Sequence, residues 1–206
     1  KELEKLQDKV PQFSFDECKA IIEKEFGKSL NHLFANFEKK PIASASISQV
    51  HKAVLKTGER VAVKVQRPNV KQIMETDIEI MFYFAKLLEK HIEKIKRFNP
   101  VKVISEFKEW TERELDFRLE ARNAKRFRQN FQGSKTVYIP KIYDELTGEK
   151  VLTLEFIEGI ELQDINGIKK KKMDFSSMIK NGFNAVMTQV FVHGIFHADP
   201  HPGNIS

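Results

Sequence analysis

Two β-rich runs in the stretch PIASASISQVHKAVLKTGERVAVKVQ constrain the fold more than any other feature of this sequence. The runs are Val50–Leu55 and Val61–Gln66, and they are joined by a turn around Thr57 and Gly58. Apolar runs of this length separated by a glycine-containing turn predict an antiparallel β-hairpin. The small residues that precede the first run set this part of the chain apart from the charged segments around it.

Helices are predicted before and after this hairpin. Residues 14–26 predict a short helix capped by Ser14, with Glu17 in the position that completes a capping box. From residue 69 to about residue 91, apolar residues recur with the period of a helix. These elements, with those that follow, predict an α+β protein.

The remaining elements alternate in type along the rest of the chain. A second long helix is predicted to begin at Asn99-Pro100 and to run to about Phe131, because asparagine followed by proline is typical of a helix start. Strands are predicted at residues 137–143 and 151–156. A last helix, over residues 175–193, is expected to end at Gly194.

Composition narrows the class of protein without identifying its partner. The 35 Lys and Arg residues exceed the 29 Asp and Glu residues, for a net charge of +6. This sign suits nucleotide phosphate, nucleic acid or an acidic lipid surface, and it does not separate them. Cys18 is the only cysteine, which indicates a reducing compartment. The most apolar late stretch, AVMTQVFVHGIF, is too short to span a bilayer, which takes about 20 residues, so we expect a soluble chain that could attach peripherally to a membrane.

Lys64 is the first candidate functional residue. Alternation along VAVKVQ places Val61, Val63 and Val65 on one face of the strand and Lys64 on the other. A lysine in the middle of a β-branched strand must reach solvent or find an anion. The simplest alternative is that Lys64 lies on a solvated face of the sheet.

Glu120 is the second candidate, because it falls within the apolar stripe of its predicted helix. At about 100° per residue, Phe127 and Phe131 lie within about 20° of Glu120 around the helix axis. A carboxylate on an apolar face costs several kcal/mol unless it is paired. We therefore predict an ion pair between Glu120 and Lys64. The alternative is that Glu120 lies at the edge of the stripe and is solvated.

The octapeptide HADPHPGN carries the third candidate site. Asp199 and Asn204 are separated by a tight proline- and glycine-rich loop. In that arrangement a carboxylate can orient a nucleophile while an amide oxygen ligates Mg²⁺, as in the catalytic loop of protein kinases. A second interpretation treats His197, Asp199 and His201 as ligands of a transition metal. A third is a turn whose polar groups only satisfy the backbone.

The segment before the hairpin has the size of a phosphate-binding loop but lacks glycine. Ordinary kinases place glycines here so that backbone N–H groups can approach phosphates. Small side chains allow a close approach, but they restrict the backbone, so we expect a stiff loop that wraps a triphosphate poorly. The loop residues are Ala43, Ser44, Ala45, Ser46, Ile47 and Ser48.

Taken together, these motifs resemble those of the UbiB family of atypical protein-kinase-like proteins, the aarF-domain-containing kinases. The resemblance covers nearly the whole chain and rests on four motifs in the family's order. These are PIASASISQVH, the alanine-rich loop; VAVKVQRP, the lysine strand; ELDFRLEA, which contains the ExD element and the following glutamate; and FHADPHPGN, the catalytic loop.

The resemblance implies a fold and a role for each matching residue. The implied fold is a kinase-like N-lobe over residues 1–158, with an antiparallel sheet and inserted helices, followed by the start of a helical C-lobe over residues 159–206. Asp199 would be the catalytic aspartate, and Asn204 a magnesium ligand. The other implied roles fall to Lys64 and Glu120 at the phosphates, Ala62 beside the adenine, Leu154 as gatekeeper, Glu155, Phe156 and Ile157 as hinge, and Glu114 and Asp116 as the ExD element.

The resemblance also implies function, cofactors and location. Family members support the biosynthesis of coenzyme Q and other prenylquinones, bind ATP, and are credited with ATPase rather than general protein-kinase activity. We therefore expect ATP or ADP and Mg²⁺ as ligands, and prenylquinone-pathway lipids or enzymes as partners, but no nucleic acid. The alternative is a catalytically inactive, nucleotide-sensing scaffold at a membrane. A prokaryotic cytoplasm, a mitochondrion or a plastid would each suit the chain.

Three features depart from the family pattern or add to it. No KxGQ motif and no DFG-type aspartate is present in the printed sequence, so we expect an internal fragment with little activity of its own. Ser44 and Ser48 replace the typical alanine and glycine of the loop, which leaves nucleotide selectivity open. The lysine run 169–172, with Lys180, could contact an acidic lipid surface, although such runs are commonly only solvated.

Overall fold

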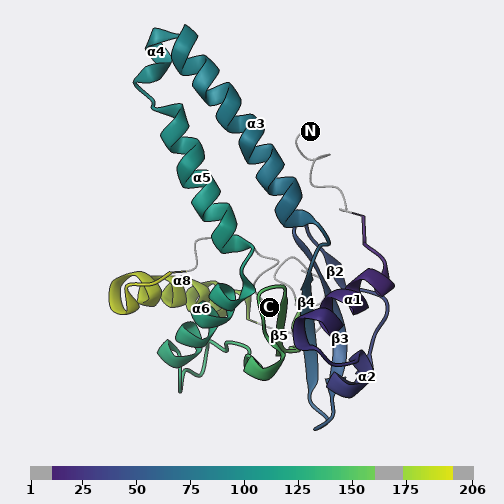
Figure 1. Ribbon diagram of the computed structural model, residues 1–206. Helices are drawn as coiled ribbons and strands as arrows, with labels where there is room; N and C mark the ends of the chain where they lie inside the picture. The colour runs from purple at the N-terminus through teal and green to yellow at the C-terminus, as the bar shows by residue number, and fades with distance from the viewer. Residues whose placement is uncertain (1–10, 161–173, 197–206) are drawn as a thin grey trace. The chain divides into compact units, whose positions relative to one another are not determined.

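A computed structural model describes residues 11–160 and 174–196 of the chain (Figure 1). The chain divides into two compact units. The first comprises residues 1–124 and 141–156, and the second comprises residues 125–140 and 157–206. The sheet and the elements packed on it belong to the first unit.

The predicted hairpin is confirmed and forms the centre of an antiparallel sheet. Strands β3 (Ser48–Leu55) and β4 (Arg60–Gln66) pair over their length, from Ser48 opposite Gln66 to Val54 opposite Arg60. Strand β5 (Val151–Glu155) confirms the strand predicted at residues 151–156, and it pairs with the other edge of β4. Lys64 therefore lies on a strand with a neighbour on each side.

Two short strands complete the sheet on the outer edge of β3, and neither was predicted. Strand β1 (Phe34–Phe37) pairs with the end of β3, and strand β2 (Ala43–Ser44) pairs with its beginning, where Ala43 lies opposite Val50. Four-residue and two-residue strands are too short to show a periodicity of 2 in the sequence. Their pairing nevertheless places the small-residue loop at the start of β3.

Helix α1 (Phe15–Phe26) packs on one face of the sheet. The predicted capping box is present: the Ser14 hydroxyl accepts a hydrogen bond from the Glu17 N–H, and the Glu17 carboxylate accepts one from the Ser14 N–H. The helix ends at Gly27, whose φ of 65° lies in the left-handed region that favours glycine. A short helix, α2 (Leu30–Leu33), then leads into β1.

Each face of the sheet carries its own apolar cluster. The face under α1 is built on Val61, Val63 and Val65, the residues that alternation placed together. The opposite face carries a smaller cluster, which includes Leu152 of β5 and residues of a later helix. Its members are Phe117, Ala121, Ile142 and Leu152, with Ile47, Ala124 and Leu154 packed around them.

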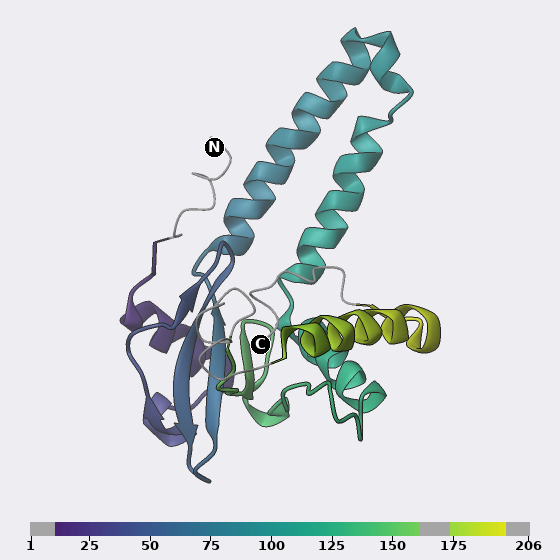
Figure 2. The ribbon, with the colours of Figure 1, turned by 180° about the vertical axis from the view of Figure 1, so that it is seen from behind.

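A helical hairpin follows β4 within the same unit. Helix α3 (Val70–His91) is confirmed over the predicted range, and the short helix α4 (Glu93–Lys96) connects it to α5 (Pro100–Glu114). Helices α3 and α5 lie side by side in both views (Figures 1 and 2). Asn99 caps α5 in the left-handed conformation, with a φ of 47°.

The prediction of one helix from Asn99 to Phe131 is wrong, because the helix breaks after Glu114. The Leu115 carbonyl accepts a hydrogen bond from the buried Gln66 side chain at 2.7 Å, and the Phe117 N–H donates to the Glu149 carbonyl at 3.0 Å. These two bonds replace helical ones. A new helix, α6 (Phe117–Asn130), begins immediately afterwards.

The predicted strand at residues 137–143 is also wrong. Only Ile142 forms an isolated bridge, to Leu154, and residues 144–146 form a 3₁₀ turn. Pro140 interrupts the run, and proline has no N–H to donate to a neighbouring strand.

In the second unit, the predicted last helix is confirmed. Helix α8 (Phe175–Thr188) is capped by Asp174, continues as a π-helical turn over Gln189–His193, and stops at Gly194. No helix among the described residues combines the length and the apolar character needed to cross a membrane.

Candidate functional site

Lys64 occupies the face of the sheet that α1 does not cover. Its cross-strand partners are Val50 on β3 and Leu152 on β5, and Ala43 lies opposite Val50 one strand further out. Residues directly opposite one another in a sheet share a face. The lysine and the first residue of the small-residue loop therefore lie in one row across the sheet.

The predicted ion pair between Lys64 and Glu120 is present. Lys64 Nζ donates to Glu120 Oε1 at 2.9 Å and to Oε2 at 2.8 Å, which joins strand β4 to helix α6. An ammonium has three N–H donors, so this arrangement leaves one available. The pair can therefore hold the lysine in place and still present a donor to an anion.

The environment of Glu120 differs from the one inferred from periodicity. We placed Glu120 in the middle of the apolar stripe of α6, but the buried side of the helix is centred on Phe117 and Ala121. The Glu120 side chain is 46% exposed and that of Lys64 is 24% exposed. Both alternatives therefore hold in part, because Glu120 is solvated and paired at once, and the pair is accessible to a ligand.

The Phe117 ring packs against the lysine of the ion pair. It is fully buried, and Lys64 Nζ lies 4.8 Å from the ring centroid, within the range of a cation–π contact. Ile47 of the small-residue loop packs against the cluster that contains Phe117. The loop and the ion pair thus share one hydrophobic support.

The small-residue loop forms a tight turn between β2 and β3. The Ala45 N–H donates to the Ser48 carbonyl at 2.8 Å, and Ser48 itself is buried. Arg67, just beyond the end of β4, donates from Nε to the Ala45 carbonyl at 2.8 Å and from Nη2 to Ser44 Oγ at 2.8 Å. The Ser44 hydroxyl is thus engaged by Arg67.

The residues expected beside an adenine lie further along the same face. Ala62 is buried on β4, with Lys52 opposite it on one side and Leu154 on the other. The end of β5 is anchored, since the Glu155 carboxylate accepts from the Lys141 N–H at 3.1 Å. The Phe156 N–H donates to the Arg60 carbonyl at 3.1 Å, and the next residue, the last of the expected hinge, is exposed.

The two carboxylates of the expected ExD element have different environments. Glu114 is exposed at the end of α5. Asp116 accepts two hydrogen bonds from the Arg118 guanidinium, at 2.8 and 2.9 Å, and one from the Arg118 backbone N–H at 3.0 Å, as a helix-capping residue does. Hydrogen bonding to Arg118 lowers the pKa of Asp116. Arg118 also lies 3.6 Å from Glu149.

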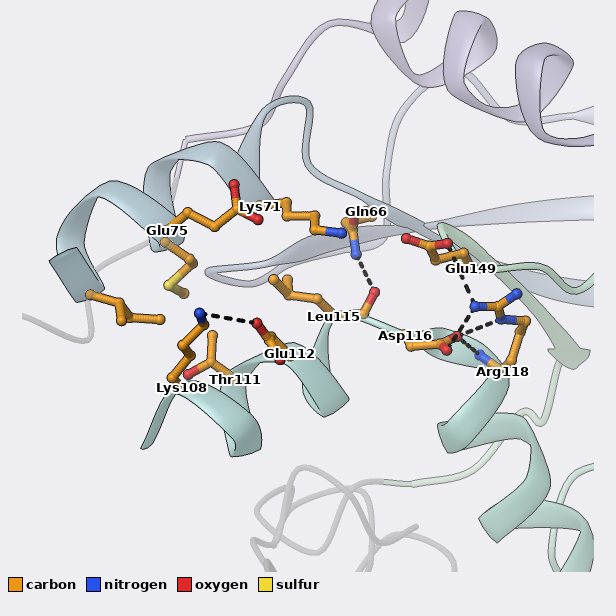
Figure 3. Close-up of a pocket in the computed structure, with 12 residues that line it drawn as sticks. Gln66, Lys71, Glu75, Lys108, Thr111, Glu112, Leu115, Asp116, Arg118 and Glu149 are labelled. Atoms are coloured by element: carbon orange, nitrogen blue, oxygen red, sulfur yellow. Dashed lines mark hydrogen bonds and ion pairs between the residues drawn. The ribbon is translucent and has the colours of Figure 1, made fainter. Parts of the chain in front are cut away.

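Asp116 and Arg118 also line a pocket of about 430 Å³ between α3 and α5 (Figure 3). Its walls carry charges of both signs, those of Lys71 and Lys108 and those of Glu75 and Glu112, and Lys108 Nζ lies 3.9 Å from Glu112 Oε1. The pocket does not include Lys64 or Glu120, so it is separate from the ion pair.

The expected catalytic loop lies outside the described residues. This applies to Asp199 and Asn204, to the alternative metal ligands His197 and His201, and to the lysine run 169–172. Within the described ranges, no group of three or more His, Cys, Asp or Glu side chains could hold a metal ion. The magnesium and transition-metal interpretations therefore stay predictions.

Three residues of the site were not singled out from the sequence. The Phe117 ring contacts Lys64, the Gln66 side chain binds the Leu115 carbonyl where α5 ends, and Arg67 binds the small-residue loop. Alternation along VAVKVQ does place Gln66 on the same face as Lys64. No pattern in the sequence indicates that Arg67 turns back toward residues 44–45, because that contact depends on how β3 pairs with β4.

Comparison with known proteins identifies the family. Residues 5–206 match the ABC1 atypical kinase-like domain. The chain is 42% identical over 204 residues to a probable protein kinase UbiB of Pseudomonas aeruginosa, and 41% identical over 203 residues to one of Marinobacter nauticus. These alignments cover 99% and 98% of this chain but only 38% and 37% of the relatives.

A solved structure supports the fold. The structure of Rv3197 from Mycobacterium tuberculosis, in complex with erythromycin, superposes with a TM-score of 0.77 at 29% identity. The match covers 98% of this chain and 49% of Rv3197. With its antiparallel sheet, its lysine–glutamate pair and this extensive similarity, the chain belongs to the ABC1 atypical kinase-like family.

Proposed function

We propose that this chain is the nucleotide-binding region of an atypical kinase-like enzyme, which hydrolyses ATP or transfers its phosphoryl group in support of prenylquinone biosynthesis. The observation that carries the proposal is the ion pair between Lys64 and Glu120. In protein kinases a strand lysine contacts the α- and β-phosphates and is held by a helix glutamate. The name UbiB, which the relatives carry, supports the assignment to prenylquinone biosynthesis.

The site fits a phosphate group in charge and access. Lys64 keeps one N–H donor after both bonds to Glu120, and its side chain is partly exposed. Glu120 neutralises the ammonium in the absence of a ligand, and its two bonds fix where the remaining donor points. Such a preorganised cation binds an anion at little cost in side-chain entropy.

We assign the remaining roles on the same basis. The nucleotide would lie between the loop Ala43–Ser48 and the residues around Ala62, with the backbone at residues 155–157 next to the adenine. We place the boundary between the two lobes at residue 158. Asp199 would orient the attacking nucleophile, and Asn204 would hold Mg²⁺, which supplies charge neutralisation at the phosphates when bound.

Calorimetric titration with ATP and ADP in the presence of magnesium tests nucleotide binding. We expect Lys64→Met to weaken nucleotide binding at least roughly tenfold, because one charge-assisted contact to the phosphates is lost. Circular dichroism should show that the fold is unchanged. Lys102→Met is the matched control, because Lys102 lies on α5 and pairs only weakly with Glu106, at 3.9 Å. Equal affinities for the unsubstituted chain and Lys64→Met would contradict the proposal.

A phosphate-release assay separates catalysis from binding alone. In the full-length protein, we expect Asp199→Asn to abolish magnesium-dependent phosphate release and to leave nucleotide binding intact. Release that survives this substitution would contradict the role of Asp199. Tight binding by the unsubstituted full-length protein without any release would favour the alternative function, a nucleotide-sensing scaffold.

A further inference from the structure

Arg67 holds the small-residue loop from the side, through contacts with two adjacent residues. Its Nε donates to the Ala45 carbonyl and its Nη2 to the Ser44 hydroxyl, each at 2.8 Å. Its own backbone N–H donates to the Ile47 carbonyl at 2.9 Å. A single residue thus makes three hydrogen bonds to a four-residue stretch of the loop.

Arg67 is itself held in this position. Its guanidinium carbon lies 5.7 Å from the centroid of the Phe13 ring, in cation–π range. Phe13 is fixed in turn, because its backbone N–H donates to Gln49 Oε1 at 3.2 Å and its carbonyl accepts from Gln49 Nε2 at 3.4 Å. Gln49 is buried on β3. The contact to the loop therefore starts from a rigid part of the sheet.

The bond to the Ala45 carbonyl determines where the next backbone N–H points. No peptide bond among the described residues is cis. In a trans peptide the C=O and the following N–H point in opposite directions. Since the Ala45 carbonyl points at Arg67, the Ser46 N–H points away from it. This N–H has no hydrogen-bond acceptor in the part of the chain that the structure describes.

We propose that Arg67 is a positioning residue of the nucleotide site, and that it orients the Ala45–Ser46 peptide so that the Ser46 N–H donates to a phosphate oxygen. This rests on the proposed function. The loop lacks the glycines that let ordinary kinase loops adapt to the phosphates, and a guanidinium that fixes one peptide plane compensates for that lack. Ile47, the next residue, packs beside Phe117 and so keeps the loop close to Lys64.

The test separates phosphate recognition from folding by comparing ligands. We expect Arg67→Met to weaken the binding of magnesium ATP and magnesium ADP roughly tenfold and to leave the binding of adenosine, which has no phosphate, unchanged. Ser44→Ala removes one of the two side-chain bonds without changing any charge, and we expect a loss of roughly threefold. Arg97→Met is the control for lost charge, because Arg97 is exposed beside α4, and should bind like the unsubstituted chain.

Amide hydrogen exchange tests the contact without any ligand. The Ala45 N–H is bonded to the Ser48 carbonyl within the loop that Arg67 holds. We expect it to exchange roughly tenfold faster in Arg67→Met and to be unchanged in Arg97→Met.

Each other outcome overturns a defined part of the reasoning. Unchanged exchange of the Ala45 N–H in Arg67→Met would refute the contact as a restraint on the loop. Faster exchange with unchanged nucleotide affinity, or an equal loss for adenosine, would refute a role in phosphate recognition. If the unsubstituted chain binds no nucleotide, the proposed function fails and the phosphate role of Arg67 fails with it, whereas the exchange result still decides whether Arg67 restrains the loop.

Discussion

His51 should make this protein less stable in mild acid, because its hydrogen bonds require a neutral ring. His51 is fully buried on β3. Its Nδ1 lies 2.9 Å from the Glu38 carbonyl, which can only accept, so Nδ1 must carry a proton. Its Nε2 lies 2.9 Å from the Gln49 amide nitrogen, which can only donate, so Nε2 must be unprotonated. A second proton on the ring would place two donors against each other.

The orientation of Gln49 is fixed independently of the histidine. The Phe13 N–H donates to Gln49 Oε1, and the Phe13 carbonyl accepts from Gln49 Nε2. A flipped amide would break both bonds. The Gln49 nitrogen therefore faces His51, and burial lowers the pKa of His51 from its ordinary value of 6.5.

The direction and the limit of the effect follow from proton linkage. A histidine whose pKa is lower in the folded state contributes full stability above pH 6.5, and this contribution is lost as the pH falls below it. If the folded state binds no proton at pH 5.5, unfolding is favoured by at most about 1.4 kcal/mol relative to pH 7.5. Carboxylates whose pKa is lowered in the folded state, such as Asp116, also stabilise the protein, but their contribution is lost only at more acidic pH.

Urea unfolding between pH 5.5 and 7.5 measures this loss. We expect the free energy of unfolding of the unsubstituted chain to fall by up to about 1.4 kcal/mol over this interval. His51→Asn keeps a donor for the Glu38 carbonyl but does not titrate, so its stability should be lower at pH 7.5 and nearly independent of pH. Equal pH dependence in the two proteins would refute the inferred protonation state.

Two further predictions concern stability. The first is a double-mutant cycle with Lys64→Met and Glu120→Gln, measured by urea unfolding. We expect a coupling energy of about 1 kcal/mol, because both side chains are partly exposed. A coupling energy above about 3 kcal/mol would contradict this and indicate a buried pair. The second is that Ser14→Ala lowers the free energy of unfolding by about 1 kcal/mol, since it removes one half of the capping box of α1. Ser105→Ala is the control, because Ser105 lies within α5 and caps no helix. An equal loss of stability in both variants would contradict the capping role of Ser14.

Local patterns predicted the centre of the sheet and the ion pair well. Alternation along β4 separated Val63 from Lys64, and the structure places them on opposite faces. The pairing of Lys64 with Glu120 followed from the cost of leaving two charges without a partner. That reasoning found the right partners although it overestimated the burial of Glu120, because a surplus of apolar residues on one side of a helix does not determine which of them face the sheet.

The interrupted helix and the unpredicted strand β2 share a physical cause, namely bonds between segments distant in sequence. The sequence around Leu115 predicts a continuous helix. The helix nevertheless stops there, because the Gln66 side chain, on strand β4, donates a hydrogen bond to the Leu115 carbonyl. The strand predicted at residues 137–143 is wrong for a local reason instead, because Pro140 removes a donor and only Ile142 pairs. Strand β2 exists because β3 offers an edge at Val50. None of these bonds can be predicted from residues that are neighbours in the chain.

The interruption between α5 and α6 makes the helical hairpin a separable module. The Gln66–Leu115 bond ties the chain back to the sheet after α5, and α6 starts afresh at Phe117. The direction of α6, and with it the place of Glu120, is thus set by the sheet rather than by the length or tilt of α3 and α5. Insertions, deletions or wholesale exchange of the hairpin can therefore accumulate during evolution without displacing the glutamate from its lysine.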